Sequence, residues 1–398
     1  MKFRKTQILP ILVSLILSIC YPLFQPVSAT QIQVDVLEQQ PELASAPTPA
    51  PKGASQQNMA LGPDQFPEGI NPLTGLPVEQ DSTLSLPPAL ISVTNFPVSA
   101  RPQAGLSYSP YVFELFIGEG MTRFLALFYG DYPDKPVAPA STSQTGLTSD
   151  NAVIGPIRSG RLAYEDIRSL YNGFLVMASA SKDVRSQLVG STNIYGSDSD
   201  NINSALIDVS KLQAIAQANA KGKTHNLTGN LFRQEAPKGG QNASNLWVFY
   251  AYLNQILWKY DPASGAYLRN QDKADGSGKF YPSTDRLTDE QLAFENVIVL
   301  YAKHNVLNGA RTLIDLDLFY TTNRAYLFRD GQVYPIYWST VSGDYEKKSG
   351  LLRPIRFVDG EGNPFPLKPG KTWVEVVDVT ATMVEKEPGY WKARFYAP

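Results

Sequence analysis

The sequence predicts an α+β protein, in which an N-terminal mixed α/β domain (residues 71–243) precedes a β-rich C-terminal domain (residues 244–398). Three observations support this prediction. Short apolar runs alternate with segments of helical periodicity up to about residue 220. From about residue 244 the runs become rich in aromatic residues and are separated by turn sequences. Hydrophobic residues make up 43% of the 398-residue chain, which is enough for a sizeable core.

Residues 1–29 are typical of a secretory signal peptide. A basic segment at residues 2–5 precedes the apolar run Ile8–Cys20, which is too short to cross a bilayer, and Ala29 closes a cleavage site. Two alternatives stay open: an uncleaved membrane anchor, and lipidation at Cys20, although the bulky Ile19 precedes that cysteine. We therefore expect an extracytoplasmic protein that is secreted, periplasmic or tethered to the membrane.

The composition of residues 30–70 predicts a disordered tether. The stretch 44–51 is rich in proline and alanine, and polar residues follow it. Such a composition buries too little apolar surface to offset the entropy lost on ordering. We expect this segment to hold a folded unit away from the membrane.

The predicted α/β domain contains both strand and helix patterns. Continuous apolar runs predict buried strands, and apolar residues at helical spacing predict helices. The short Gly-Glu-Gly-Met segment between two of the strands predicts a hairpin turn or a close pass of the backbone. The expected strands cover 89–94, 111–117, 122–128 and 174–178, and the expected helices cover 162–171, 184–188 and 212–220.

The predicted C-terminal domain is built from strands and turns. Alternating apolar and polar residues indicate strands with one buried face, and two Asp-Gly pairs indicate hairpins. The expected strands cover 246–252, 256–260, 296–301, 314–318 and 391–395, and the Asp-Gly pairs lie at 330–331 and 359–360.

Composition excludes several classes of function. The 35 Lys and Arg residues nearly balance 37 Asp and Glu residues, so the chain has no excess of basic residues for nucleic-acid binding. Two histidines and one cysteine are too few for a structural zinc or iron–sulfur site, and we expect neither a metal nor a cofactor. The sequence also lacks a Gly-x-Ser-x-Gly nucleophile motif.

Several sequence blocks carry a family resemblance: Asn71–Gly75, Asn95 with Arg101–Ser107, Glu119–Phe124, Ile154–Arg161, His225–Leu227, Asn296–Val299, Leu327–Gly331 and Leu367–Glu375. Together they resemble the YerB-like bacterial exported proteins, an uncharacterised family of lipoprotein type. The resemblance runs from about residue 71 to 377 and implies an α/β domain followed by a smaller β-rich domain. It implies no activity, because none is established for the family. The chain departs from the family pattern at Thr94, at Phe96 and in the segment Ala178–Ser181.

Three arginines in these blocks, Arg123, Arg158 and Arg161, are candidate ligand-binding residues. The guanidinium group offers a planar set of donors that suits carboxylates and phosphates. The alternative is a structural network in which the arginines neutralise Glu114 and Glu119. The sequence alone leaves both interpretations open.

Other residues of the matching blocks complete the candidate ligand-binding set. His225 could act as an acid or base near neutral pH, or could fix its loop by a hydrogen bond. The set also includes Glu119, Asn95, Arg101 and Asn226.

The leading functional hypothesis is a non-catalytic envelope protein that binds an anionic or sugar-like ligand, or a protein partner. One alternative is an extracytoplasmic hydrolase that acts on cell-wall material through Glu119 and His225, which would require both residues and Arg158 in one cleft. Another is an envelope scaffold without a small-molecule site. We expect contact with a membrane only through an N-terminal anchor.

Overall fold

The structure is a computed structural model that describes residues 60–134, 152–193, 205–221 and 225–398. The predicted signal peptide with Cys20, and residues 30–59 of the predicted tether, lie outside the described residues. Residues 60–70 pack on the fold, because the backbones of Leu61 and Phe232 exchange hydrogen bonds of 2.9 and 2.8 Å. The folded part therefore includes the last residues of the stretch expected to be a tether.

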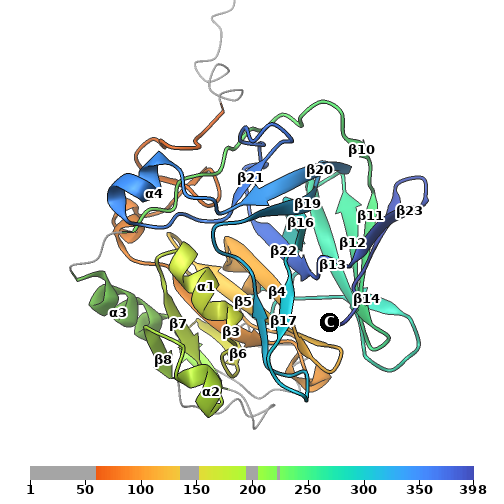
Figure 1. Ribbon diagram of the computed structural model, residues 1–398, viewed down its shortest axis with the longest axis horizontal. Coiled ribbons are helices and arrows are strands. Elements are labelled where there is room, and N and C mark those ends of the chain that lie inside the picture. The colour runs from red at the N-terminus through yellow and green to blue at the C-terminus, as the bar shows by residue number, and fades with distance from the viewer. Residues whose placement is uncertain (1–59, 135–151, 194–204, 222–224) are drawn as a thin grey trace, which may run out of the picture. The chain divides into compact units, whose positions relative to one another are not determined.

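A thirteen-stranded sheet forms the centre of the fold (Figure 1). Its strands follow the order β10-β20-β19-β16-β22-β4-β5-β3-β6-β9, with β21 beside β20, β7 beside β3, and β8 beside β7. The central pairs β16–β22 and β22–β4 are parallel, whereas β4–β5 and β5–β3 are antiparallel. The strands are β3 Ala89–Thr94, β4 Tyr111–Gly118, β5 Met121–Phe128, β6 Val153–Ile157, β7 Phe174–Met177, β8 Ser191–Asn193, β9 Ala205–Asp208, β10 Gln241–Asn242, β16 Asn296–Tyr301, β19 Thr322–Arg329, β20 Gln332–Ser339, β21 Arg356–Val358 and β22 Thr372–Val377.

A second, seven-stranded sheet follows the order β14-β13-β12-β11-β24-β23, with β15 beside β13. Two small hairpins complete the strand set. The second sheet consists of β11 Asn245–Ala251, β12 Asn254–Asp261, β13 Ala266–Asp272, β14 Phe280–Pro282, β15 Ala293–Phe294, β23 Thr382–Glu387 and β24 Tyr390–Arg394; the hairpins are β1 Ile70–Asn71 with β2 Leu76–Pro77, and β17 His304–Val306 with β18 Ile314–Leu316.

Apolar clusters cover both faces of the large sheet. Successive residues of β3 point to opposite faces, as in any strand. Ile91 packs in one cluster with Trp258 of the second sheet, whereas Leu90 packs in the other cluster with Ile167 of helix α1. All residues of β3, β4, β16 and β22 are buried, which explains why these strands are mostly apolar; Glu114 of β4 and Glu375 of β22 are their charged residues.

Helices contribute little to the described part of the chain. Figure 1 shows α1, α2 and α3 around β3, β6, β7 and β8, at one end of the large sheet. They correspond to the three predicted helices, whereas α4 was not predicted. The helices are α1 Ala163–Leu170, α2 Lys182–Arg185, α3 Val209–Ala220 and α4 Asp344–Ser349, together with three 3-10 turns at Asp81–Ser85, Val98–Ala100 and Leu106–Tyr108.

The predicted α+β class is therefore correct only in part, because the fold is mostly β. The α/β pattern exists locally, where β3 and β7 are parallel neighbours and α1 precedes β7. The large sheet, however, also takes in β10, β16 and β19–β22, five of which come from beyond residue 244. Strand β22 lies between β16 and β4, so the two predicted domains share one sheet. The division at residue 244 stays a prediction about the organisation of the chain.

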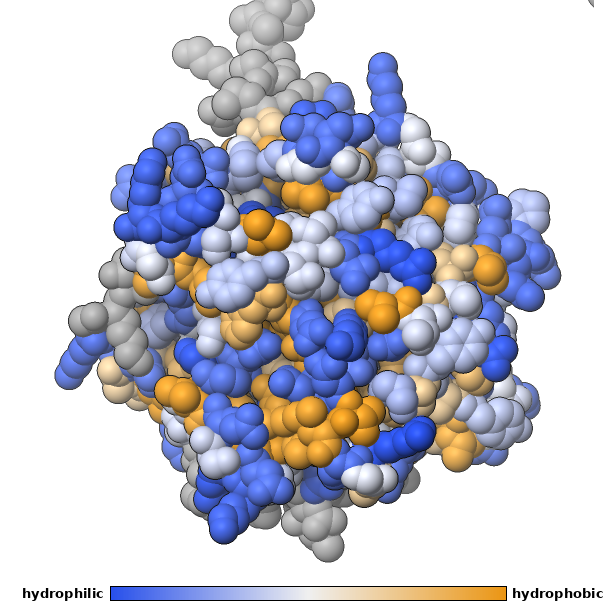
Figure 2. All heavy atoms as spheres, viewed as in Figure 1, coloured by the Kyte–Doolittle hydropathy of each residue, from blue (hydrophilic) through white to orange (hydrophobic). Residues whose placement is uncertain are grey.

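The surface drawn in Figure 2 is largely hydrophilic, with hydrophobic residues in small patches among charged ones. No helix in the described ranges is long and apolar enough to cross a bilayer.

Candidate functional site

The three candidate arginines come together at one hollow, which we call the arginine pocket. Its volume is about 560 Å³, and Glu119 also lines it. These four residues come from two separate segments of the chain, the β4–β5 hairpin and the loop after β6. The pocket is lined by Phe96, Pro97, Val98, Ile117, Glu119, Met121, Arg123, Arg158, Arg161 and Thr312.

The pocket begins where strand β3 changes its neighbour. The first half of β3 pairs with β7, whereas Val93 near its end pairs with Ile157 of β6. The chain leaves the sheet directly after Ile157, and the backbone N–H of Arg158 donates to the carbonyl oxygen of Ser92 at 2.9 Å. The N–H of Ala178, just after β7, donates to the carbonyl of Arg158 at 3.1 Å. Backbone bonds to β3 and to the end of β7 thus fix the loop that carries Arg158 and Arg161.

The hairpin between β4 and β5 supplies a second wall. Gly118 and Gly120 both have positive φ, as the tight turn requires. A Cβ atom on Gly118 would lie 2.7 Å from the carbonyl oxygen of Arg311, so glycine allows the β17–β18 loop to approach. This approach places Thr312 on the pocket, while Glu119 is exposed at the tip of the turn. The structure confirms both the hairpin and the close backbone pass expected from the sequence.

Arg123 is the most buried of the three arginines, with 6% of its surface exposed. Its Nη1 donates to the carbonyl of Ser159 at 2.8 Å, and its Nε is buried without a hydrogen-bond partner. The pKa of Arg123 is lowered to about 10, chiefly by burial; the charges of Arg161 and Arg158 act in the same direction, and Tyr164 opposes them. Arg123 is still a cation at neutral pH.

Arg161 lies partly exposed beside it. Its Nη1 donates to the carbonyl of Gly160 at 2.9 Å, and its Nε is buried without a partner. Burial, followed by the charge of Arg158, lowers the pKa of Arg161, although Tyr164 acts in the opposite direction. Within the described ranges, neither Arg123 nor Arg161 forms an ion pair, so both guanidinium groups keep donors for a ligand.

The observed contacts of Glu114 do not match the alternative in which the three arginines neutralise it. Glu114 is fully buried and pairs with Arg269 of the second sheet at 2.8 Å. Its other oxygen accepts hydrogen bonds from Thr122 at 2.6 Å and from Asn95 at 3.3 Å. Glu114 is therefore already satisfied by a different cation.

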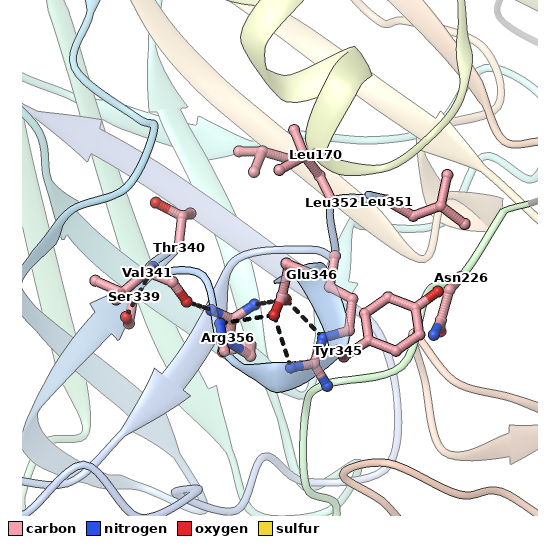
Figure 3. Close-up of polar contacts among 12 residues, drawn as sticks. Leu170, Asn226, Ser339, Thr340, Val341, Tyr345, Glu346, Leu351, Leu352 and Arg356 are labelled. Atoms are coloured by element: carbon pink, nitrogen blue, oxygen red, sulfur yellow. Dashed lines mark hydrogen bonds and ion pairs between the residues drawn. The ribbon is translucent and has the colours of Figure 1, made fainter. Parts of the chain in front are cut away.

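A second arginine cluster, formed by Arg353 and Arg356, is an example of a structural ion-pair network in this fold (Figure 3). It lines a larger hollow of about 640 Å³ beside helix α4. Arg353 and Arg356 both bind Glu346, at 2.7 and 2.9 Å, and Arg353 also binds Asp64 at 2.8 Å. Burial alone would raise the pKa of Glu346, but hydrogen bonds from Arg353 and from backbone N–H groups lower it to about 2. These arginines are occupied by carboxylates, unlike Arg123 and Arg161.

Asn95 and Arg101 lie behind the arginine pocket and do not line it. Asn95 is buried and donates to Thr122 at 2.9 Å. Arg101 donates through Nε to Asn95 and through Nη1 to the carbonyl of Asp272 at 2.7 Å, and it stacks on Phe96 at 4.8 Å. These two residues therefore hold Phe96, which forms part of the pocket wall. Their positions do not favour the expectation that they contact the ligand directly.

His225 and Asn226 do not line the arginine pocket. His225 contacts the carbonyl of Leu84 at 3.0 Å and the ring of Tyr129, which directly follows β5. Six residues of extended chain separate Tyr129 from Arg123, roughly 20 Å at the rise of a strand. Asn226 accepts a hydrogen bond from the N–H of Thr228 and lies in the neighbourhood of Glu346 (Figure 3). The structure thus does not bring His225 to Glu119, as the hydrolase hypothesis requires.

The sequence-based set missed the apolar part of the pocket. Phe96, Ile117 and Met121 line it together with the arginines. The spacing of Met121 and Arg123, two residues apart on β5, could have indicated that their side chains share a face. No sequence signal placed Thr312 there. In the part of the chain that the structure describes, no three His, Cys, Asp or Glu residues are grouped as a metal site requires.

The chain matches two family models that together cover most of its length. Residues 73–241 match "Protein of unknown function (DUF3048) N-terminal domain", and residues 247–374 match the corresponding C-terminal domain. "Putative lipoprotein YerB" of Bacillus subtilis is 27% identical over 352 residues, which cover 84% of this chain and 94% of that protein. The crystal structure of the YerB protein from Bacillus subtilis has the same fold, with a TM-score of 0.58 and 24% identity over 77% of this chain and 96% of that chain. These matches confirm the resemblance inferred from the sequence blocks.

Proposed function

This chain belongs to the DUF3048 family, and we propose that it is an extracytoplasmic protein that binds an anionic ligand in the arginine pocket without catalysing a reaction. The extracytoplasmic location is supported by the pattern of residues 1–29 and by the similarity to a protein named as a lipoprotein. The similarity alone assigns no ligand, so the binding function rests on the site.

The observation that carries the proposal is the charge of Arg123 and Arg161, which no carboxylate of the described residues neutralises. Among the described residues, three arginines line the hollow together with one acid, Glu119, which is exposed to solvent. Arg123 and Arg161 have no carboxylate partner among the described residues, and each keeps donors toward the hollow. Charge-assisted hydrogen bonds from such donors to a carboxylate or phosphate are about twice as strong as neutral ones.

The positions of the other candidate residues favour binding over catalysis. Glu119 and Arg158 line the arginine pocket, but His225 does not, so the acid–base pair of the hydrolase alternative is not assembled. A scaffold without a small-molecule site would not require arginines at an open hollow. We therefore retain the hydrolase and the scaffold only as outcomes of the experiment.

The experiment measures binding of inorganic phosphate by isothermal titration calorimetry to the purified protein and to Arg161→Ala. Loss of one charge-assisted contact of about 1.5–3 kcal/mol predicts a roughly 10- to 100-fold weaker affinity. The melting temperature should change little, because the side chain of Arg161 is bonded only to the adjacent carbonyl. Arg185→Ala, which removes an exposed arginine of helix α2, is the matched control.

Three results would contradict the proposal. The parent protein fails to bind phosphate, Arg161→Ala binds as well as the parent, or Arg161→Ala and the exposed Arg185→Ala weaken binding equally. Turnover of a cell-wall substrate that depends on Glu119 would instead support the hydrolase.

A further inference from the structure

A second hollow, which we call the small hollow, adjoins the arginine pocket. Its volume is about 220 Å³. It is lined by residues of the segment 98–103 and by residues of the strands β13 and β14 with the positions that follow them. Val98 lines both this hollow and the arginine pocket, but none of the arginines of the arginine pocket lines the small hollow.

Arg101 brings a cation to the small hollow. Its Nε donates to Asn95 at 3.1 Å, and its Nη1 donates to the backbone carbonyl of Asp272 at 2.7 Å. Its Nη2 is buried and, within the described residues, has no hydrogen-bond partner. The pKa of Arg101 is lowered to about 10, chiefly by burial and then by the charge of Arg269, so the group is still a cation at neutral pH.

Asp272 brings an acid to the same hollow. The residue is 4% exposed, and its Oδ1 is buried without a hydrogen-bond partner in the part of the chain that the structure describes. Burial raises the pKa of Asp272, although the backbone N–H of Gln255 and the charge of Arg101 oppose the rise. A buried carboxylate oxygen without a donor is costly, because burial removes the water that would otherwise bind it.

The two groups do not satisfy each other. Among the described residues the side chains of Arg101 and Asp272 form no ion pair, although the guanidinium group donates to the backbone carbonyl of Asp272. Three residues earlier on β13, Arg269 binds Glu114 directly at 2.8 Å. The small hollow therefore keeps one buried donor and one buried acceptor, of opposite charge, for a ligand.

Apolar side chains form much of the remaining lining of the small hollow. They are Val98, Pro102, Tyr281 and Pro282. Lys273 also lines the hollow, and its Nζ lies 3.9 Å from the centre of the Tyr281 ring. The volume is below the lower limit of about 300 Å³ for pockets that take drug-sized ligands. A matching ligand is therefore small and partly apolar.

We propose that the small hollow binds a free α-amino acid with an apolar side chain. Its carboxylate accepts from Nη2 of Arg101, its ammonium group donates to Oδ1 of Asp272, and its side chain lies against Val98 and Tyr281. The two charged groups of an α-amino acid are attached to one carbon atom, and Arg101 already contacts Asp272, so one small molecule can reach both. Charge-assisted hydrogen bonds are about twice as strong as neutral ones, which favours a zwitterion over a neutral sugar. Arg101 thus binds this second ligand and not the anion of the arginine pocket.

The experiment titrates the purified protein at neutral pH with L-leucine, isocaproate and isoamylamine by isothermal titration calorimetry. Isocaproate lacks the ammonium group of leucine and isoamylamine lacks its carboxylate, and both keep the side chain. Loss of one charge-assisted contact should weaken each analogue roughly 10- to 100-fold relative to L-leucine. Asp272→Asn should weaken L-leucine by the same factor and leave isocaproate unchanged. Asp275→Asn, which alters an exposed acid three residues later, is the matched control and should change neither.

The ligand series on the parent protein tests the proposal without any variant. Failure of L-leucine to bind, or equal affinity for L-leucine and isocaproate, would overturn the assignment to an amino acid. Glucose that binds more tightly than L-leucine would overturn the zwitterion in favour of a neutral sugar. L-leucine that binds Asp272→Asn as well as the parent would overturn the role of the small hollow.

Arg161→Ala separates this inference from the proposed function. The variant should weaken phosphate and leave L-leucine unchanged, because Arg161 does not line the small hollow. L-leucine that no longer binds Arg161→Ala would place the amino acid in the arginine pocket and would overturn the inference. Failure of phosphate to bind the parent would overturn only the proposed function.

Discussion

Replacement of Glu375 by glutamine should stabilise the protein at alkaline pH. Glu375 lies on β22 directly opposite Glu114 of β4, and both carboxyl groups are fully buried. Arg269 pairs with Glu114, whereas Glu375 accepts hydrogen bonds from Trp258 at 2.8 Å and from Tyr250 at 3.1 Å. One guanidinium thus serves two adjacent carboxyl groups, and the second carboxyl group is costly to ionise.

The magnitude follows from the pKa. Burial, and then repulsion by Glu114, raise the pKa of Glu375 from 4.5 to about 8, although Arg269 and the two hydrogen bonds oppose the rise. The stability that this group contributes is fully present below pH 4.5 and is lost as the pH rises through 8, because the unfolded chain releases the proton first. The free energy of unfolding should fall by up to about 1.4 kcal/mol per pH unit across this range, or at most about 4–5 kcal/mol in total.

The assay is urea unfolding of the parent and of Glu375→Gln, followed by tryptophan fluorescence between pH 5 and 8.5. The amide oxygen can still accept from Trp258, and the amide N–H can donate to Tyr250, so the two proteins should differ little at pH 5. At pH 8.5 the variant should be more stable by several kcal/mol. Glu114→Gln is the control and should destabilise, because it removes the partner of Arg269. Parallel stability curves for Glu375→Gln and the parent, or a variant that is less stable at pH 8.5, would refute the reasoning.

Two further predictions concern the two arginine clusters. Glu346→Gln should destabilise the protein by about 1–3 kcal/mol at pH 7, because it removes the carboxylate shared by Arg353 and Arg356. The folded-state pKa of Glu346 is lowered to about 2, so this stabilisation is present above pH 4.5 and is lost toward pH 2. Urea unfolding should therefore show a smaller difference in stability between the parent and Glu346→Gln at pH 3 than at pH 7. An equal difference at the two pH values would contradict the role of the Glu346 carboxylate. Met121→Glu should place a carboxylate beside Arg123 on the same face of β5, which should raise the melting temperature and abolish phosphate binding. Met121→Gln is the control and should do neither. Phosphate binding that survives Met121→Glu would exclude the arginine pocket as the binding site.

Local elements could be predicted from the sequence because local patterns determine them. Continuous apolar runs correctly indicated β3, β7 and β16, and the glycines at 118 and 120 indicated the β4–β5 hairpin. Helix α1 follows from apolar residues at helical spacing, of which Ile167 and Leu170 are buried. The short helix α4 gave no such signal, because only one of its residues, Glu346, is buried.

The arrangement of these elements could not be predicted in the same way. Strand β22 pairs with β4 although about 260 residues separate them in the sequence, and the apolar runs carry no information about that pairing. The change in composition near residue 244 suggested separate domains, yet β16 and β19–β22 join the sheet of the first domain. His225 was grouped with the arginines only because it lies in a matching block, and blocks do not specify distances.

The arginines were the part of the site that the sequence predicted. More informative is that Arg123 and Arg161 have no carboxylate partner among the described residues. Folding alone favours a carboxylate beside a buried guanidinium, because an unpaired buried charge is costly. The same chain satisfies this requirement at Arg269 and at Arg353. Arg123 is about as buried as these residues, yet within the described part of the chain it donates to a carbonyl and to no carboxylate, beside two further cations. The fold avoids this cost elsewhere and retains it here, and the anion that we propose as the ligand would offset it.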